Sequence, residues 1–479
     1  MPHLRACLGG ALCALLLLAA PASAQSNPEI GAAPDTSTLR AIEGQVSQIR
    51  GLEALAEPDL QLLDHASLTT YLANQFERDY LPNERESDQK EFVLLGLIKP
   101  TDNIVQIQLN LLSDQVIGIY DSGTKSLFVV ADQAGFGPAE RMTYAHEFNH
   151  ALQDQYYDLN KIAPKHPASN DRSLAVHALI EGDAIMLQTL WARSNLSQDD
   201  LIQLARVTAS SDDILARAPL VVRTELLFPY IDGFNFVRQA YRQAGNDYAV
   251  LDDLFKNPPE STAQLLHPEK YRNHVHPVDV QLGDVAARLG PDWRTVGSGV
   301  LGELDTRVLL EQWGTGHSDA IHTASGWSGD HWQLVEKDGR SAIVVRSTWE
   351  TPDAAQSFFS VYSRGLGTRF DSAMVEESSS TRQALTTPIT ATDVRLVGSD
   401  VLTVIAFDRE SAGAIVDAVM TSAPLPALAL GCTSPPHPGG PAPGGATGHL
   451  HCATDTPAPP ESDRQDRHRR SGQLGRRLR

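Results

Sequence analysis

The stretch Tyr144-Ala-His-Glu-Phe-Asn-His150 places two histidines four residues apart. On an α-helix this spacing brings both imidazoles onto the same face, one turn apart. Two neutral imidazole nitrogens in that arrangement can bind one tetrahedral zinc ion, each at about 2.0–2.1 Å. Glu147 follows the first histidine and falls beside the metal, where it can take a proton from a water on the zinc ion. His146 and His150 are therefore predicted zinc ligands, and Glu147 is a predicted catalytic base.

The flanks of this stretch support a helix. Gly137-Pro138 gives a start signal, and Met142, Ala145 and Phe148 begin an apolar stripe at helical spacing. Two plainer interpretations stay open. One is an ordinary amphipathic helix that matches the pattern by chance. The other is a site that has lost its activity but retains the residues of the motif.

Two runs rich in β-forming residues lie just upstream. Val116–Tyr120 and Leu127–Val130 flank a turn that contains Gly123, which is typical of a hairpin. An exposed strand edge close to a metal site can hold an extended peptide by strand addition. That role is a hypothesis, and a purely structural hairpin explains the pattern equally well.

A catalytic zinc site needs a third protein ligand and an open position for water. One common solution requires glycine at position 153 and histidine at position 156, but this chain has Gln153 and Tyr156. The other common solution is a glutamate from a following helix. Glu181 is the candidate, because it lies in an apolar stretch of a predicted helix from Ser173 to about Arg193. An unpaired carboxylate is costly to bury there.

Two neighbours of Glu181 bear on this assignment. Gly182 would let this helix and the helix of the histidines approach each other closely, since it has no side chain. His177 lies one turn before Glu181 on the same face. It is an alternative ligand, or a residue that supports the ligands or contacts substrate, although a lone helix histidine is more often simply packed or solvated. A half-exposed Glu181 without metal is the plain alternative.

The pattern His146-Glu147-x-x-His150, with Glu181 on a second helix, resembles the gluzincin group of zinc metallopeptidases. Residues 150–155 (His-Ala-Leu-Gln-Asp-Gln) and 179–184 (Leu-Ile-Glu-Gly-Asp-Ala) are similar to exported, largely uncharacterised bacterial proteins of that kind. The resemblance implies a zincin-like fold, one zinc ion per chain and hydrolysis of peptide bonds.

The resemblance also implies a carboxylate that steadies a ligand histidine. In the thermolysin type this aspartate follows the ligand glutamate by four positions, but here that position is Ile185. Asp154, one turn after His150, and Asp183 are the two candidates, and the sequence does not choose between them.

Residues 225–237 form a helical run that Pro229 interrupts, which predicts a kink or a break. Tyr230 at this break can present its hydroxyl group to a developing oxyanion. A tyrosine that fills the kink is the more ordinary interpretation.

Composition constrains partners and location. The net charge of -20 argues against a nucleic-acid surface, which needs basic patches. Arg5, an apolar run and then Ala22-Ser23-Ala24 have the order of a signal peptide. No later stretch approaches the roughly 18 apolar residues of a membrane span. We therefore expect an exported protein, periplasmic or extracellular, without a membrane anchor.

The predicted fold class is α+β, because a long helical region is followed by alternating β patterns and helices. We expect a mostly helical zincin-like domain with a β-hairpin before the histidine helix, and then a small α+β domain built from two ββα units. The tail has too few apolar residues to offset the entropy of its own ordering. The predicted segments are 1–24 (signal peptide), 25–36 (leader), 37–318 (zincin-like catalytic domain), 319–425 (C-terminal α+β domain) and 426–479 (disordered Pro/Gly/Arg-rich tail).

The sequence thus predicts an exported zinc peptidase that acts on a peptide or protein substrate. The main alternative is a non-catalytic envelope protein that binds a partner and keeps a structural or vestigial metal site. A third possibility is a metallohydrolase that acts on a non-peptide amide, which substrate profiling would separate. Against the main alternative, structural zinc sites usually have four protein ligands. The only cysteines beyond the signal peptide, Cys432 and Cys452, lie in the tail.

Overall fold

The computed structural model describes residues 35–421, apart from residues 116, 131–135, 166–168, 209–211 and 371. The chain divides into two units at Leu425, and the described residues all belong to the first of them. The predicted signal peptide, the tail and the leader up to residue 34 lie outside the described residues.

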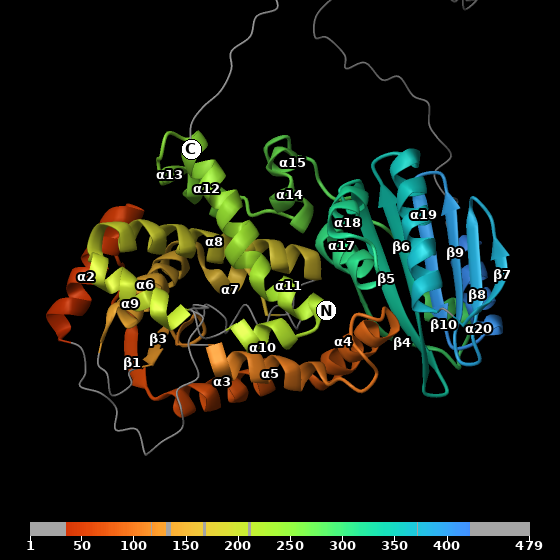
Figure 1. The fold of residues 1–479 in the computed structure, drawn as a ribbon, viewed down its shortest axis with the longest axis horizontal. Helices are drawn as coiled ribbons and strands as arrows, with labels where there is room; N and C mark the ends of the chain where they lie inside the picture. The colour runs from red at the N-terminus through yellow and green to blue at the C-terminus, as the bar shows by residue number, and fades with distance from the viewer. Residues whose placement is uncertain are drawn as a thin grey trace, which may run out of the picture. The chain divides into compact units, whose positions relative to one another are not determined.

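The fold is of the mixed α+β class, as predicted, with most helices before the larger sheet in chain order (Figure 1). The helices are α2 (Thr36–Arg50), α3 (His65–Asp79), α4 (Pro82–Leu94), α5 (Ile104–Gln115), α6 (Pro138–Tyr157), α7 (Leu159–Ile162), α8 (Asn170–Asn195), α9 (Gln198–Thr208), α10 (Asp212–Arg217), α11 (Leu220–Phe228), the π-helical turn η1 (Pro229–Gly233), α12 (Phe234–Gln243), α13 (Ala249–Lys256), α14 (Thr262–Leu266), α15 (Pro268–Arg272), α16 (Val285–Leu289), α17 (Gly302–Gln312), α18 (His317–Ala324), α19 (Pro352–Arg369) and α20 (Arg409–Met420).

The strands form two sheets. The first has the order β1-β3-β2, and the second has the order β4-β5-β6-β10-β9-β8-β7. The strands are β1 (Asp59–Leu63), β2 (Gly118–Asp121), β3 (Ser126–Val130), β4 (Arg294–Gly299), β5 (Trp327–Lys337), β6 (Arg340–Trp349), β7 (Met374–Ser378), β8 (Arg382–Thr386), β9 (Ala391–Val397) and β10 (Asp400–Ala406).

The small sheet lies against the histidine helix. Strands β2 and β3 form the predicted hairpin, and β1 pairs in parallel with β3. Helix α6 packs on both hairpin strands. It begins at Pro138, where the sequence predicted, because proline at the first helical position has no N–H group to lose.

Helix α8 runs for 26 residues and connects distant parts of the described fold. In its first turn the Oδ1 atom of Asp171 accepts a hydrogen bond from the backbone N–H of Thr262 at 3.1 Å. Near its end the indole Nε1 of Trp191 donates to Gln45 of α2 at 2.9 Å. Between these points it packs along α6, and buried apolar side chains of both helices share one core.

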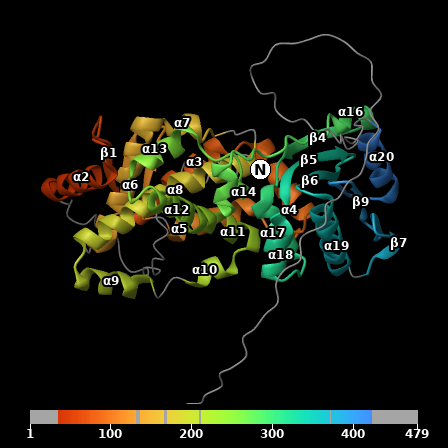
Figure 2. The same cartoon turned by 90° about the horizontal axis from the view of Figure 1, so that it is seen from above.

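The larger sheet is covered on both faces. Alternate residues of β6 point to opposite sides, so Ile343 and Val345 pack with α19 whereas Ala342 and Val344 pack with α20. Figure 2 shows α20 and α16 on one side of these strands and α19 on the other. Both predicted ββα units are present, and β6 and β10 pair at the centre. The sheet also contains β4, upstream of the boundary predicted at residue 319.

A glutamate on β5 ties α4 to the larger sheet. Glu336 accepts hydrogen bonds from Lys90 of α4 and, at 2.6 Å, from Arg294 of β4. Hydrogen bonding to Lys90, and then to Arg294, lowers the pKa of Glu336 from its ordinary value of 4.5 to about 2, although burial opposes this change. The contact therefore stabilises the folded state fully above pH 4.5, and its contribution is lost as the pH falls from 4.5 to about 2.

Replacing Glu336 by Gln should lower the stability of the folded state at pH 7 but not near pH 2. Urea unfolding at several pH values between 7 and 2 gives the free energy of unfolding of the wild type and of the variant. The two values should differ at pH 7 and approach each other as the pH falls to 2. The control is Asp253→Asn, because the ion pair between Asp253 and Lys256 has both side chains mostly exposed, at 77% and 64%, and such pairs contribute little. A gap between Glu336→Gln and wild type that stays constant with pH would contradict the assignment.

The break predicted at Pro229 is present as η1, which joins α11 to α12 without a loop. Its last residue, Gly233, touches Gly182 of α8. A methyl group built on Gly182 would lie 2.4 Å from the carbonyl carbon of Gly233. One built on Gly233 would lie 2.0 Å from the carbonyl oxygen of Ala178. The close approach expected at Gly182 therefore occurs, but its partner is η1, not the histidine helix.

Replacing Gly182 by Ala should lower the free energy of unfolding by about 1–3 kcal/mol, because the colliding atoms belong to backbone that cannot turn aside. The change in the urea midpoint measures it. Gly413→Ala in α20 is the matched control: its methyl group meets nothing within 4 Å, and alanine is favoured over glycine in a helix by about 1 kcal/mol. If Gly182→Ala and Gly413→Ala are equally stable, the backbone at Gly233 moves away from the added methyl group at little cost in free energy.

Candidate metal centre

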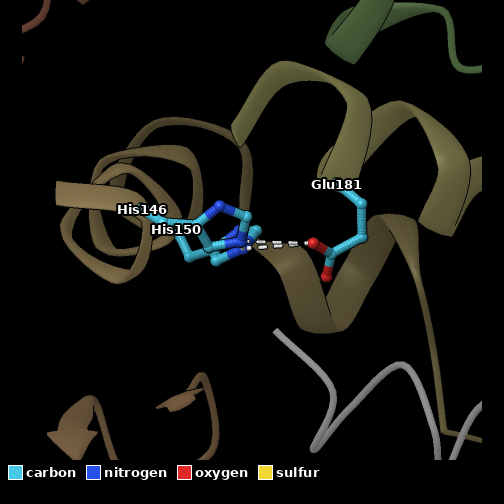
Figure 3. A group of neighbouring side chains, drawn as sticks. All are labelled: His146, His150 and Glu181. Carbon is cyan, nitrogen blue, oxygen red and sulfur yellow. Dashed lines mark hydrogen bonds and ion pairs between the residues drawn. The ribbon is translucent and has the colours of Figure 1, made fainter. Parts of the chain in front are cut away.

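Three predicted ligands come together in the structure. His146 and His150 leave α6 one turn apart, and both imidazoles face Glu181 on α8 (Figure 3). All three side chains are buried, with exposed fractions of 0% for each histidine and 3% for Glu181. One ligand atom from each residue lies within 4.8 Å of the other two. Among the described residues this is the one group of three or more His, Cys, Asp or Glu side chains with such geometry.

The ligand atoms point at a common centre. Oε2 of Glu181 lies 3.3 Å from Nε2 of His146 and 3.7 Å from Nε2 of His150. The two Nε2 atoms are 3.0 Å apart. Acceptor atoms gathered this closely in a buried place need a shared cation or shared protons. This buried group can therefore hold a metal ion.

The other ring nitrogen of each histidine is held by a glutamine. Nδ1 of His146 is 2.9 Å from Oε1 of Gln188, and Nδ1 of His150 is 2.7 Å from Oε1 of Gln153. The amide nitrogen of Gln153 donates to the Ile180 carbonyl at 3.0 Å and to Asp183 at 2.8 Å. The orientation of this amide is thus fixed, so Oε1 must accept and Nδ1 of His150 must donate. In the imidazole form that binds a metal, the lone pair of His150 is then on Nε2.

The electrostatics favour the forms that bind a metal. Burial lowers the pKa of His146, which keeps this imidazole neutral at pH 7. Burial raises the pKa of Glu181, but the adjacent histidines lower it by more, to about 2. Metal binding requires a neutral imidazole and an ionised carboxylate. His146 and Glu181 are therefore in these forms at neutral pH.

Glu147 is fully buried next to the first histidine, on the side of α6 that faces β2. A methyl group built on Gly118 of β2 would lie 3.3 Å from Cγ of Glu147 and 2.4 Å from Cγ2 of Thr143. The missing side chain at Gly118 thus lets the strand approach α6 beside the carboxylate. The side chain of Glu147 therefore lies against the hairpin.

The two candidate supporting aspartates differ in position. Asp154 accepts from the Tyr120 hydroxyl at 2.8 Å, from Lys125 at 2.5 Å and from the Leu159 backbone at 3.1 Å. These bonds tie the end of α6 to the hairpin. Asp183 lies closer to the ligands, since it binds the amide of Gln153 that holds His150. Its contact with a ligand histidine is therefore indirect, through Gln153.

The remaining candidates lie outside the group of three ligands, one on α8 and one on η1. His177 is buried on α8, one turn before Glu181. Tyr230 is half-buried on η1, which packs on α8. The sequence did not single out Gln153 or Gln188 as supporting residues. Their spacing was the available signal. Gln153 follows His150 by three residues and Gln188 follows Glu181 by seven, so each glutamine lies on the same helix face as that ligand candidate.

No helix among the described residues is long and apolar enough to cross a membrane. A family described as a domain of unknown function (DUF8575) matches residues 288–416, which run from α16 into α20. The matched range does not include the metal group, that is, His146, His150 and Glu181. No curated protein and no solved structure matches the chain. The similarity to known proteins therefore covers the larger sheet, and the chemistry of the metal group has to be argued from its own residues.

Proposed function

We propose that this chain is a zinc-dependent peptidase. The observation that carries the proposal is the spacing of the ligand atoms. On a tetrahedral zinc ion with bonds of about 2.0–2.1 Å, neighbouring ligand atoms lie about 3.3–3.4 Å apart. The three separations here are 3.0, 3.3 and 3.7 Å. A donor set of two imidazoles and one carboxylate is also among those that catalytic zinc sites use.

The donor set favours a catalytic over a structural site. A structural zinc ion usually has four protein ligands, whereas a catalytic one keeps a position open. The described residues offer three ligands at this place. This is the observation that weighs against the alternative of a non-catalytic envelope binding protein with a structural metal.

A zinc ion bound here would act as a Lewis acid, which lowers the pKa of a coordinated water and polarises a carbonyl group. Glu147 is the residue proposed to take the proton from that water and to pass it to the leaving amine. The buried position of its carboxylate, directly after the ligand candidate His146 on α6, favours this role. Tyr230 is the proposed donor to the developing oxyanion, which it would reach from η1.

Two features support the resemblance to gluzincins as part of this proposal. The third ligand comes from a second helix, α8, and a hairpin packs on the helix of the histidines. Strand β2 is at the edge of the described small sheet, but all four of its residues are buried, so the exposed edge that would pair with an extended peptide is not seen there. The substrate proposed from the resemblance is a peptide or protein, met in the periplasm or outside the cell.

The test is metal content followed by hydrolysis. The purified mature chain, supplied with zinc and then dialysed, is expected to retain about one zinc ion per chain. It should cleave members of a quenched-fluorescence peptide mixture, lose this activity with a chelator and regain it with zinc. A chain that retains no zinc sinks the proposal. A chain that retains zinc but cleaves no peptide favours the binding-protein alternative.

A further inference from the structure

Arg50, the last residue of α2, is a charged side chain with no exposed surface. Its Nε lies 3.3 Å from Oδ2 of Asp183, and its Nη1 donates to Oδ1 of Asp252 at 2.9 Å. Its Nη2 faces the hydroxyl oxygen of Tyr157 at 3.3 Å, and this hydroxyl donates to Asp252 at 2.6 Å. A buried guanidinium is costly unless paired. The fold therefore places it between two carboxylates on α8 and α13.

The carboxylate of Asp183 is shared between Arg50 and two amide side chains of α6. The same oxygen, Oδ2, that lies beside Arg50 also accepts from Nε2 of Gln153 at 2.8 Å and from Nδ2 of Asn149 at 3.4 Å. Both amides belong to α6, where Asn149 directly precedes the ligand His150. Asp183 is thus held on one side by a cation from α2 and on the other by the helix that carries the histidines.

The chain of contacts ends on a ligand. Gln153 has one amide oxygen and one amide nitrogen, and Asp183 and the Ile180 carbonyl both occupy the nitrogen side. The oxygen is therefore directed to Nδ1 of His150, 2.7 Å away. The links from Asp183 through Gln153 to His150 are buried hydrogen bonds with donor and acceptor fixed, and Arg50 joins Asp183 as an ion pair. In a low-dielectric surrounding such contacts hold their orientation firmly.

We propose that Arg50 is a positioning residue of the metal centre. Through Asp183 and Gln153 it holds the ring of His150 in the orientation, and in the tautomer, that directs Nε2 to the metal. The inference rests on the proposed metal function of His146, His150 and Glu181. It makes α2, which contributes no ligand, part of the metal centre.

A purely structural role for Arg50 is the competing explanation, and Asp252 separates the two. Asp252 pairs with Arg50 and Tyr157, and its described hydrogen bonds do not include Gln153. If Arg50 serves stability alone, losing Asp252 and losing Arg50 should have effects of the same kind. If Arg50 positions His150, the loss of Arg50 should weaken zinc binding and the loss of Asp252 should not.

The experiment compares Arg50→Met, Gln153→Met, the double variant and Asp252→Asn in the full mature chain. Zinc affinity is measured against a competing chelator, and the visible spectrum of the Co²⁺-loaded protein reports the ligand geometry. Thermal unfolding of the metal-free protein reports stability. Arg50→Met and Gln153→Met should each weaken zinc binding by about 10–100-fold, as loss of supporting contacts does at other metal sites. Both should shift the Co²⁺ spectrum.

The double variant gives the sharpest result. Because the two residues act in series, it should bind zinc no more weakly than the weaker single variant. Asp252→Asn should lower the unfolding temperature and leave zinc affinity and spectrum as in wild type. Additive losses in the double variant, or wild-type affinity in Arg50→Met, overturn the inference. So does an equal loss of affinity in Asp252→Asn.

If Arg50→Met does not fold, Arg50→Lys replaces it, because the buried positive charge is kept while the forked contact is lost. The same lack of additivity with Gln153→Met is then required. The failure of this inference differs from failure of the proposed function. A wild-type chain that binds no zinc ends both, whereas one that binds zinc and cleaves peptides, with Arg50→Met unaffected, ends only the positioning role.

Discussion

The Glu147→Gln variant is expected to keep its zinc and to lose hydrolysis by about 10²–10⁴-fold, the contribution of a general base. Glutamine has the shape of glutamate, so the packing of this buried side chain against Gly118 should survive. Its amide cannot accept the proton that the carboxylate takes. Zinc content and the rate of peptide cleavage, measured on one preparation, give both halves of the result.

Glu140→Gln, in the first turn of the same helix, is the matched control and should retain both zinc and activity. Loss of zinc in Glu147→Gln would mean that this carboxylate helps to hold the metal. Unchanged cleavage with zinc retained would show that another group is the base.

The Glu181→Ala variant is expected to lose stoichiometric zinc. It removes one of the three proposed ligands and the only anionic one among them, so the loss of affinity should exceed the roughly 10–100-fold typical of supporting residues. The metal-free variant should still fold, because removing a buried carboxylate also removes its desolvation cost. Zinc per chain after dialysis measures the first effect, and thermal unfolding without metal measures the second.

Glu303→Ala provides the comparison for Glu181→Ala. Glu303 is also 3% exposed and also pairs with a histidine, His267, at 2.7 Å, but it lies on α17. This variant should lose stability and keep its zinc. If both variants lose zinc, the effect of Glu181→Ala reflects general unfolding. If Glu181→Ala keeps stoichiometric zinc, Glu181 is not a ligand.

The sequence was most informative where a short-range pattern carries the chemistry. The spacing of His146 and His150 specifies one helix face, so their convergence follows from helical geometry alone. Glu181 required a second argument, the cost of burying a carboxylate among apolar residues, and the structure brings it to the histidines. Both arguments use residues within one or two helices.

The residues that support the candidate ligands could not be predicted, because no feature of the sequence around them indicates their role. Gln153 and Gln188 are neutral side chains whose roles depend on which helix packs against theirs. Arg50 ends an ordinary amphipathic helix, and only the packing of α2 on α6 and α8 buries its charge. The partner of Gly182 was likewise wrong, because a glycine signals a close approach without naming the neighbour.

The larger sheet shows the same division. The sequence predicted the long hairpins β5–β6 and β9–β10, whose apolar residues recur at strand spacing. It missed β4, β7 and β8. Strand β4 contains two glycines, and most residues of β7 are exposed, so neither has the alternation that marks a half-buried strand.

Helix α8 has one further consequence. At about 1.5 Å per residue it is a rod of about 39 Å, anchored by Asp171 at one end and by Trp191 near the other. Glu181 lies near the middle of the helix. A movement of Glu181 along the helix axis would therefore also displace the hydrogen bonds of Asp171 and Trp191. A molecule that bound preferentially when the Asp171 anchor was displaced would change metal affinity from a distance, and zinc would change the affinity for that molecule by the same factor. The metal affinity of the candidate centre is therefore expected to depend on both anchors, although neither is a candidate ligand.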